Sequence, residues 1–223
     1  MASRAAPERM ADFFDARASG YEEHMRRSVA DFARFYESVA GAVARTNRAV
    51  RILDIGCGTG LELEAIVTRA PNARITALDV SAGMLRELRK RYEARVDQFE
   101  VIQGSYLELP LGEERYQYVV AVMTLHHLLP ARKRALYRKV RKALGPGGTY
   151  IEGDWVVSRD EEGGQISHCG ESGEAQERAL DGRYHIDVPL SVDTERRLLL
   201  EAGFSSVDEV WHSDSTAVFA ARD

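Results

Sequence analysis

Short apolar runs alternate with stretches of helical periodicity along most of this chain. The runs predict strands at residues 50–55, 74–79, 99–103, 116–124, 150–157, 207–211 and 216–221. Apolar residues at helical spacing between them predict helices at residues 61–69, 82–95, 131–144 and 191–202. This alternation is typical of an α/β protein built on an open sheet with helices on both faces. We therefore expect one such domain over residues 49–223.

Two parts of the chain do not follow this alternation of strands and helices. Residues 1–48 are mixed in charge and helical in pattern, with a helix at 29–44, and we interpret them as an N-terminal helical cap. Residues 158–186 are polar and rich in glycine, so they predict either a lid or a short helix over a pocket. We expect residues 10–25 and this second segment to cover the functional site.

A glycine-rich turn follows the first predicted strand. Asp54 lies near the end of the apolar run, and Gly56, Gly58 and Gly60 follow at alternate positions before a helix begins. A strand, a glycine turn and a helix in this order let the backbone approach a nucleotide-like ligand. The dinucleotide fingerprint G-x-G-x-x-G needs its third glycine one residue later, where this chain has Leu61. The spacing therefore disfavours a dinucleotide.

The segment Leu53-Asp-Ile-Gly-Cys-Gly-Thr-Gly60 resembles the first motif of class I S-adenosylmethionine-dependent methyltransferases. Later motifs extend the resemblance over about residues 50–157. It implies a Rossmann-like open sheet, mostly parallel with an antiparallel last strand, and S-adenosyl-L-methionine as the cofactor. It also implies that N-terminal helices cover the cofactor, which makes Arg17 and Tyr21 candidates for the cofactor carboxylate or the substrate. A solvated Arg17 and a core Tyr21 are the alternative.

Residues near the ends of the predicted strands complete the expected cofactor site. Asp79 follows Gly60 at close to the offset of about 20 residues at which an acid binds ribose hydroxyls in nucleotide-binding βαβ units. The resemblance places Met84 against the adenine, and it places Ser105 where the family often has an acid for the adenine amino group. The cofactor-binding residues that we predict are Tyr21, Asp54, Gly56, Cys57, Gly58, Gly60, Asp79, Val80, Met84, Gly104, Ser105, Tyr106 and Val122.

Polar side chains near the ends of the fourth and fifth strands are candidates for the acceptor side. Methyl transfer from a sulfonium needs mainly an aligned nucleophile, and a general base helps where the acceptor carries a proton. We predict His127, Asp154 and His185 as the catalytic residues. If the chain is extended at the paired histidines, only one of them faces the pocket, and the resemblance favours His127 over His126.

Acidic residues on and beyond the fifth strand carry two further expectations. Glu152 and Asp154 alternate along that strand and share a face, so their proximity is expected to raise the pKa of one of them. His185 and Asp187 suggest a metal site, but their spacing lacks the tight clustering of strong metal motifs. We therefore expect no metal.

Composition narrows the class of protein. The net charge of −5 and the pI of about 5.8 do not favour general nucleic-acid binding. The two cysteines give no disulfide framework, and Cys57 lies inside the glycine turn, which fits a reducing cytosol. The sequence shows neither a signal peptide nor an apolar stretch of membrane-spanning length. We expect a cytoplasmic monomer or homodimer without a membrane partner.

The predicted activity is methyl transfer from S-adenosylmethionine to a small-molecule acceptor by in-line displacement. A tRNA-base methyltransferase is the first alternative, with the arginine-rich helices near 86–95 and 132–142 as its contact surface. Without such a partner, we expect the charges of the second of these helices to face solvent. A non-catalytic protein that binds S-adenosylmethionine and regulates a partner is the other alternative. The sequence does not identify the acceptor.

Overall fold

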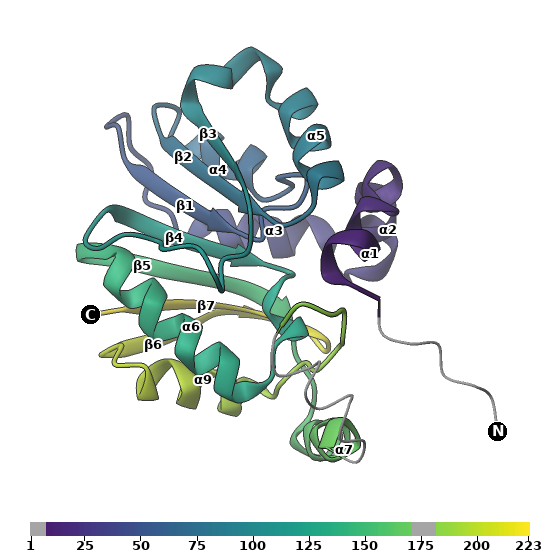
Figure 1. The fold of residues 1–223 in the computed structure, drawn as a ribbon. Helices are drawn as coiled ribbons and strands as arrows, with labels where there is room; N and C mark the ends of the chain where they lie inside the picture. Colours follow the sequence, from purple (N-terminus) through teal and green to yellow (C-terminus); the bar gives the residue numbers. More distant parts are fainter. Residues whose placement is uncertain (1–7, 171–181) are drawn as a thin grey trace.

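A seven-stranded sheet forms the centre of the molecule in the computed structural model, which describes residues 8–170 and 182–223 (Figure 1). The strand order is β3-β2-β1-β4-β5-β7-β6. β7 pairs antiparallel with β5 and β6, whereas the neighbouring pairs from β3 to β5 are parallel. The predicted mostly parallel sheet with an antiparallel last strand is confirmed. The strands are β1 Arg51–Ile55, β2 Arg74–Asp79, β3 Phe99–Gln103, β4 Tyr116–Val122, β5 Leu144–Trp155, β6 Ser206–His212 and β7 Thr216–Arg222.

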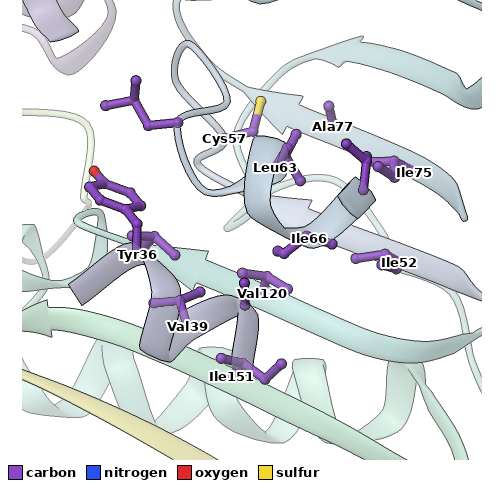
Figure 2. Close-up of a cluster of buried hydrophobic side chains, with 14 of the residues drawn as sticks. Tyr36, Val39, Ile52, Cys57, Leu63, Ile66, Ile75, Ala77, Val120 and Ile151 are labelled. Atoms are coloured by element: carbon purple, nitrogen blue, oxygen red, sulfur yellow. The ribbon is translucent and has the colours of Figure 1, made fainter. Parts of the chain in front are cut away.

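Helices cover both faces of this sheet, as predicted. α3, α4 and α5 pack against one face, and α6 and α9 pack against the other. Figure 2 shows the first of these two cores, in which side chains of α3 and α4 meet those of β1, β2, β4 and β5. The helices are α1 Met10–Asp15, η1 Ala18–Gly20, α2 Tyr21–Ser28, α3 Phe32–Gly41, α4 Leu63–Arg69, α5 Ala82–Arg91, η2 Glu93–Gln98, η3 Leu125–His127, α6 Pro130–Ala143, α7 Arg159–Gly170 and α9 Val192–Glu201.

Element boundaries differ from the predictions mainly where glycine or charge obscures the pattern. The fifth strand begins six residues earlier than predicted, at Leu144 instead of Tyr150, because Leu144 pairs with Tyr116 across a register shift. The helix predicted over 82–95 ends at Arg91, and a 3₁₀ segment follows it. Strands β2 and β3 have the predicted bounds.

The prediction that all charges of α6 face solvent is wrong for Lys133. This side chain is fully buried, and its ammonium pairs with Glu195 and lies 3.8 Å from Oε1 of Glu152. The Tyr137 hydroxyl lies within hydrogen-bond distance of both carboxylates, at 2.7 Å from Glu195 and 3.0 Å from Glu152. Tyr150 donates to the other oxygen of Glu152 at 2.9 Å. Lys133 is buried because it lies one turn before Tyr137 on the inward stripe of the helix, where the two acids neutralise it.

The segment α1–η1–α2, residues 10–28, lies at one end of the strands beside α5, and we call it the cap (Figure 1). Oδ1 of Asp15 accepts hydrogen bonds from the Ser81 hydroxyl at 2.6 Å and from the Gly83 amide at 2.7 Å. Glu22 pairs with Arg91 at the far end of α5. α3 packs on the sheet instead, so the cap proper is shorter than the predicted segment 1–48.

The segment predicted as a lid or short helix contains α7 over part of its length. Residues 171–181 lie outside the described part of the chain. Beyond them, the Met10 amide donates to the Arg183 carbonyl at 2.8 Å and the His185 amide donates to the Glu8 carbonyl at 2.9 Å. This segment therefore joins the cap directly. Among the described residues, we find no helix that is long and apolar enough to cross a membrane.

Candidate active site

The glycine turn after β1 takes a conformation that other residues rarely adopt. Gly56, Gly58 and Gly60 have φ angles of 69°, 50° and 72°. A Cβ atom on Gly56 would lie 2.2 Å from the hydroxyl of Thr124, so the turn also leaves no room for a side chain there. The Gly56 amide is held by the Leu78 carbonyl at 2.7 Å, which fixes the turn against the end of β2.

Asp79 lies directly against this turn, as the spacing predicts. Its carboxylate accepts hydrogen bonds from the Gly58 amide at 2.9 Å and from the Ser81 amide at 2.8 Å. Burial raises the pKa of Asp79 to about 6, although these amide hydrogen bonds oppose the shift. From the cap, Tyr21 reaches the same place, because its ring would lie 3.7 Å from a Cβ on Gly58.

The remaining predicted cofactor residues surround the turn to different degrees. The Gly104 amide donates to the Asp79 carbonyl at 2.8 Å, which brings the segment after β3 beside the carboxylate. The Ser105 hydroxyl accepts from the amide two residues on, and the Tyr106 hydroxyl lies 3.4 Å from Thr124. Cys57, Met84 and Val122 are buried in the hydrophobic core, whereas Val80 is half-buried.

A cavity of about 720 Å³ opens next to the turn, between the cap and the ends of β4 and β5. Aromatic and histidine side chains dominate its wall, and residues from the cap, from η3, from the end of β5 and from the segment after residue 182 contribute to it. They include Phe13, Tyr21, His126, His127, Trp155 and His185. A cavity of this size encloses most of a small organic molecule.

Both paired histidines line the cavity, and the prediction that only one of them does is wrong. The prediction assumed extended backbone, whereas His126 and His127 belong to the 3₁₀ turn η3, which places their ring centroids 3.9 Å apart. His126 Nδ1 lies 2.5 Å from Oδ1 of Asp154, whose other oxygen accepts from the amides of Leu125 and His126. Asp154 therefore lies behind His126 and positions it.

One of the two acids of β5, Glu152, has a raised pKa as expected, but its proximity to Asp154 is a smaller cause than burial and Glu195. Burial and then the nearby Glu195 raise the pKa of Glu152 to about 8. Burial acts in the same direction on Asp154, but the charge and hydrogen bond of His126 outweigh it and lower the pKa of Asp154 to about 2. Asp154 is thus an ionised hydrogen-bond acceptor near neutral pH.

His127 and His185 meet across the wall of the cavity, with ring centroids 4.7 Å apart. His127 Nδ1 lies 2.8 Å from the Ile186 carbonyl and 3.2 Å from Oδ1 of Asp187. Burial and then His126 lower the pKa of His127. Burial and then His127 lower the pKa of His185 to about 4, and its ring stacks on Phe13 at 3.5 Å. Both shifts favour the neutral form of the ring.

Sequence reasoning did not single out two residues that the structure places at the site. Asp15 connects the cap to α5, and Phe13 supports His185. Their partners lie far along the chain, so no local pattern connects them. The only available signal was the aromatic pair that begins the cap.

Several known proteins that resemble this chain in sequence are methyltransferases or related enzymes. Residues 52–148 match the family described as Methyltransferase domain. The carboxy-S-adenosyl-L-methionine synthase of Wolinella succinogenes is 28% identical over 233 residues, covering 94% of this chain and 92% of that protein. The sterol 24-C-methyltransferase of Saccharomyces cerevisiae is 25% identical, covering 78% of this chain and 47% of its own length.

Solved structures share the fold over nearly the whole chain. The DhpI-SAM-HEP complex is 25% identical with a TM-score of 0.68, and the match covers 95% of each chain. A putative O-methyltransferase from Nostoc punctiforme has a TM-score of 0.72 at 22% identity, covering 99% of this chain and 63% of that chain.

Residues 52–148 match a methyltransferase domain, and the glycine turn, the sheet order and these similar proteins support a class I S-adenosylmethionine-dependent methyltransferase. The protein is therefore an enzyme, and its cofactor is S-adenosyl-L-methionine.

Buried polar atoms beside the turn fit this cofactor. Within the part of the chain that the structure describes, both carboxylate oxygens of Asp54, the Thr59 hydroxyl and Oε1 of Glu62 are buried without a hydrogen-bond partner. Burial and the neighbouring Glu62 raise the pKa of Asp54 well above its usual range. Unpartnered acceptors in a buried site are costly, and a ligand with positive charge and N–H or O–H donors would satisfy them. S-adenosylmethionine brings both.

We expect Asp79→Ala to weaken S-adenosylmethionine binding about 10- to 100-fold, because it removes a buried acceptor for the ribose hydroxyls. If Asp79 accepts from the ribose as predicted, the binding form is its ionised carboxylate, whose pKa is about 6, so we expect affinity to be present above that pH and to be lost as the pH falls through it. Calorimetry should show wild-type affinity falling about tenfold from pH 7 to pH 5.

The matched control is Asp79→Asn, which keeps the shape of the side chain and removes its titration. We expect weak binding with little pH dependence over this range. Unchanged affinity in Asp79→Ala would remove Asp79 from the cofactor site.

Proposed function

We propose that this enzyme transfers a methyl group to a small-molecule acceptor bound in the cavity between the cap and the ends of β4 and β5. The observation that carries the proposal is the position of this cavity, whose wall includes Tyr21, which contacts the glycine turn, together with His126, His127 and His185. Its aromatic wall and volume of about 720 Å³ suit a molecule of modest size.

Bound S-adenosylmethionine supplies a methyl group on a sulfonium, which is already electrophilic. The protein then has three tasks. The cap excludes water from the cavity, the aromatic wall orients the acceptor in line with the methyl group, and a neutral imidazole takes a proton where the acceptor carries one. We assign this last task to His127, with His185 orienting the acceptor beside it. Asp154 acts through His126, as a positioning residue.

The acidic chain and the pairing of its basic side chains support a small acceptor over tRNA. Arg91, Arg134 and Arg141 form ion pairs within the protein, with Glu22, Glu201 and Asp223. The ammonium of Lys139 donates to the Tyr106 and Leu107 carbonyls, and Lys133 is buried. Side chains already paired in this way contribute less to phosphate binding.

The names of two similar proteins agree with the proposal that the methyl acceptor is a small molecule. One similar protein is named as a sterol 24-C-methyltransferase, and one similar structure holds SAM and HEP together. The match to carboxy-S-adenosyl-L-methionine synthases over most of the chain favours a second candidate, in which the cofactor itself is modified.

A methyl-labelled cofactor separates these functions. The enzyme is incubated with labelled S-adenosylmethionine and, in parallel, with a small-metabolite extract, with total tRNA and with neither. The proposal expects label in a low-mass product from the extract alone. Label in tRNA, with binding that falls steeply with salt, would favour the tRNA alternative. A carboxylated cofactor would favour the synthase activity, and cofactor binding without any product would favour the regulatory role.

We expect the cap to become more protected from hydrogen exchange when both cofactor and acceptor bind. The ligands add contacts to Phe13 and Tyr21, which stabilise α1 and α2 against local opening. Mass-resolved exchange of peptides from residues 10–28 and 159–170, with and without ligands, provides the measurement. Strand β6 lies at the edge of the sheet away from β1 and is the internal control. Equal exchange in the cap would contradict this role for it.

A cytoplasmic location and a monomeric or homodimeric state remain part of the proposal. The buried free thiol of Cys57 is compatible with a reducing compartment. Sedimentation of the purified protein would decide between the two oligomeric states.

A further inference from the structure

Three imidazole nitrogens surround one carboxylate oxygen at the wall of the acceptor cavity. Oδ1 of Asp187 lies 3.2 Å from His127 Nδ1, 3.7 Å from His185 Nε2 and 3.8 Å from His126 Nε2. The ligand atoms of His126, His127 and Asp187 all lie within 4.8 Å of one another. Nitrogen and oxygen ligands bind a transition metal at about 2.0–2.2 Å, which leaves neighbouring ligand atoms about 3–3.6 Å apart. The cluster is close to that spacing.

We propose that His126, His127 and Asp187 bind a divalent transition-metal ion, with His185 beside them as an additional ligand. Two imidazoles and one carboxylate suit zinc, iron, cobalt or nickel, whereas magnesium and calcium prefer oxygen ligands. The sequence did not predict this site, because only the fold of η3 brings the paired histidines to Asp187.

The hydrogen bond between His126 Nδ1 and Asp154 orients the other ring nitrogen, Nε2, for metal binding. Asp154 accepts from His126 Nδ1 at 2.5 Å, which assigns a ring proton to Nδ1. In the neutral ring the lone pair is then on Nε2, which lies 3.8 Å from Oδ1 of Asp187. The same carboxylate is fixed by the amides of Leu125 and Trp155. A histidine oriented by a carboxylate in this way is the usual arrangement around protein-bound metals.

His127 and Asp187 are also placed to bind a metal ion. The Val188 amide donates to the His126 carbonyl at 2.7 Å, which holds the segment carrying Asp187 against η3. The side chain of Asp187 is 63% exposed, so an ion has access to it from the cavity. His127 Nδ1 donates to the Ile186 carbonyl in the metal-free protein, and an ion bound to Nδ1 would move the ring proton to Nε2. In the ion-bound protein His127 is therefore a ligand and not the base, and the ion takes over the activation of the acceptor.

Three protein ligands leave further positions of the ion open toward the cavity. An open position accepts an oxygen or nitrogen of a small molecule and lowers its pKa. In the proposed function this molecule is the acceptor. The metal site itself does not depend on that function, because binding can be measured on the protein alone.

The experiment uses Co²⁺ and Zn²⁺ on the full chain after treatment with a chelator. We expect one ion per chain by calorimetry and by elemental analysis after dialysis, and visible absorption bands from bound Co²⁺. Asp187→Asn and His126→Gln should each weaken binding about 100-fold or more, and Asp154→Asn about 10- to 100-fold. His212→Gln, which removes an exposed histidine on β6, should leave binding unchanged.

Circular dichroism and melting temperature establish that each variant is folded. A bound ion should also raise the melting temperature of the wild type but not that of Asp187→Asn. Absence of stoichiometric binding by the wild type would overturn the proposal. Binding that survives in both Asp187→Asn and His126→Gln would overturn it as well. Failure to find a methyl acceptor affects neither measurement, so the two proposals fail independently.

Discussion

His127→Gln is expected to lower turnover about 10²- to 10⁴-fold while S-adenosylmethionine affinity stays within about twofold of the wild type. The side chain lines the acceptor cavity, with its neutral ring held by the Ile186 carbonyl and Asp187. Glutamine fills much of the same space but cannot take a proton near pH 7. Turnover with an identified acceptor, calorimetry with the cofactor and the melting temperature are measured together.

Turnover, cofactor affinity and melting temperature, taken together, distinguish a role of His127 in proton transfer from a role in packing. A histidine that only packs would lower the melting temperature together with activity. His212→Gln is the control for loss of a histidine outside the site. Full turnover in His127→Gln would show that positioning alone drives the reaction, without a base at this residue. His185→Ala and Asp154→Asn extend the series, and we expect smaller losses because neither is assigned the proton transfer.

Lys133→Met is expected to reduce the free energy of unfolding by about 3–5 kcal/mol. The substitution leaves Glu195 and Glu152 buried without their cation, and burial already raises the pKa of Glu152 to about 8. For a chain of this length the loss corresponds to a melting temperature about 6–20 °C lower. Chemical denaturation and thermal melting at pH 7 check both values.

The pH dependence of this loss has a defined sign. Lys133 lowers the pKa of Glu152 in the wild type, so its removal raises this pKa further above the value in the unfolded chain. The folded variant keeps Glu152 protonated at a pH where the unfolded chain releases that proton. The destabilisation therefore grows as pH rises and shrinks toward pH 5. Lys142→Met changes an exposed lysine on the same helix and should alter stability by less than about 0.5 kcal/mol. Equal effects of the two substitutions would contradict the assigned role of Lys133.

The fold was largely predictable because its information is local. β2 and β3 have the predicted bounds, since β2 is a run of mostly buried residues and β3 is a short run with half-buried apolar residues. The buried Lys133 was predictable in principle, because it shares a helical stripe with Leu136, Tyr137 and Val140. The positive charge of Lys133 led instead to the prediction that this side chain faces solvent. The pairing of charges across α6, β5 and α9 is a tertiary feature that one stripe does not reveal.

The cofactor half and the acceptor half of the site also differ in how far local sequence predicts them. The predicted cofactor half rests on the motif, because Asp79 and the glycine turn occupy consecutive βα units and lie in contact. The acceptor half depends on contacts between distant segments. His126 meets Asp154 across 28 residues of sequence, and Asp187 joins them from a third segment. The 3₁₀ turn that exposes both paired histidines to the cavity has no signature in the residues themselves.

Helix α1 has a direct consequence for how the two ligands influence each other. Asp15 at its end binds the start of α5 on the cofactor side, and Met10 at its beginning binds the Arg183 carbonyl on the acceptor side. In the proposed function this one short helix borders both ligands, so that neither exchanges without disturbing the enclosure of the other. Coupling of this kind is reciprocal. An acceptor that holds α1 in place raises the affinity for the cofactor by the same factor by which the cofactor raises the affinity for the acceptor.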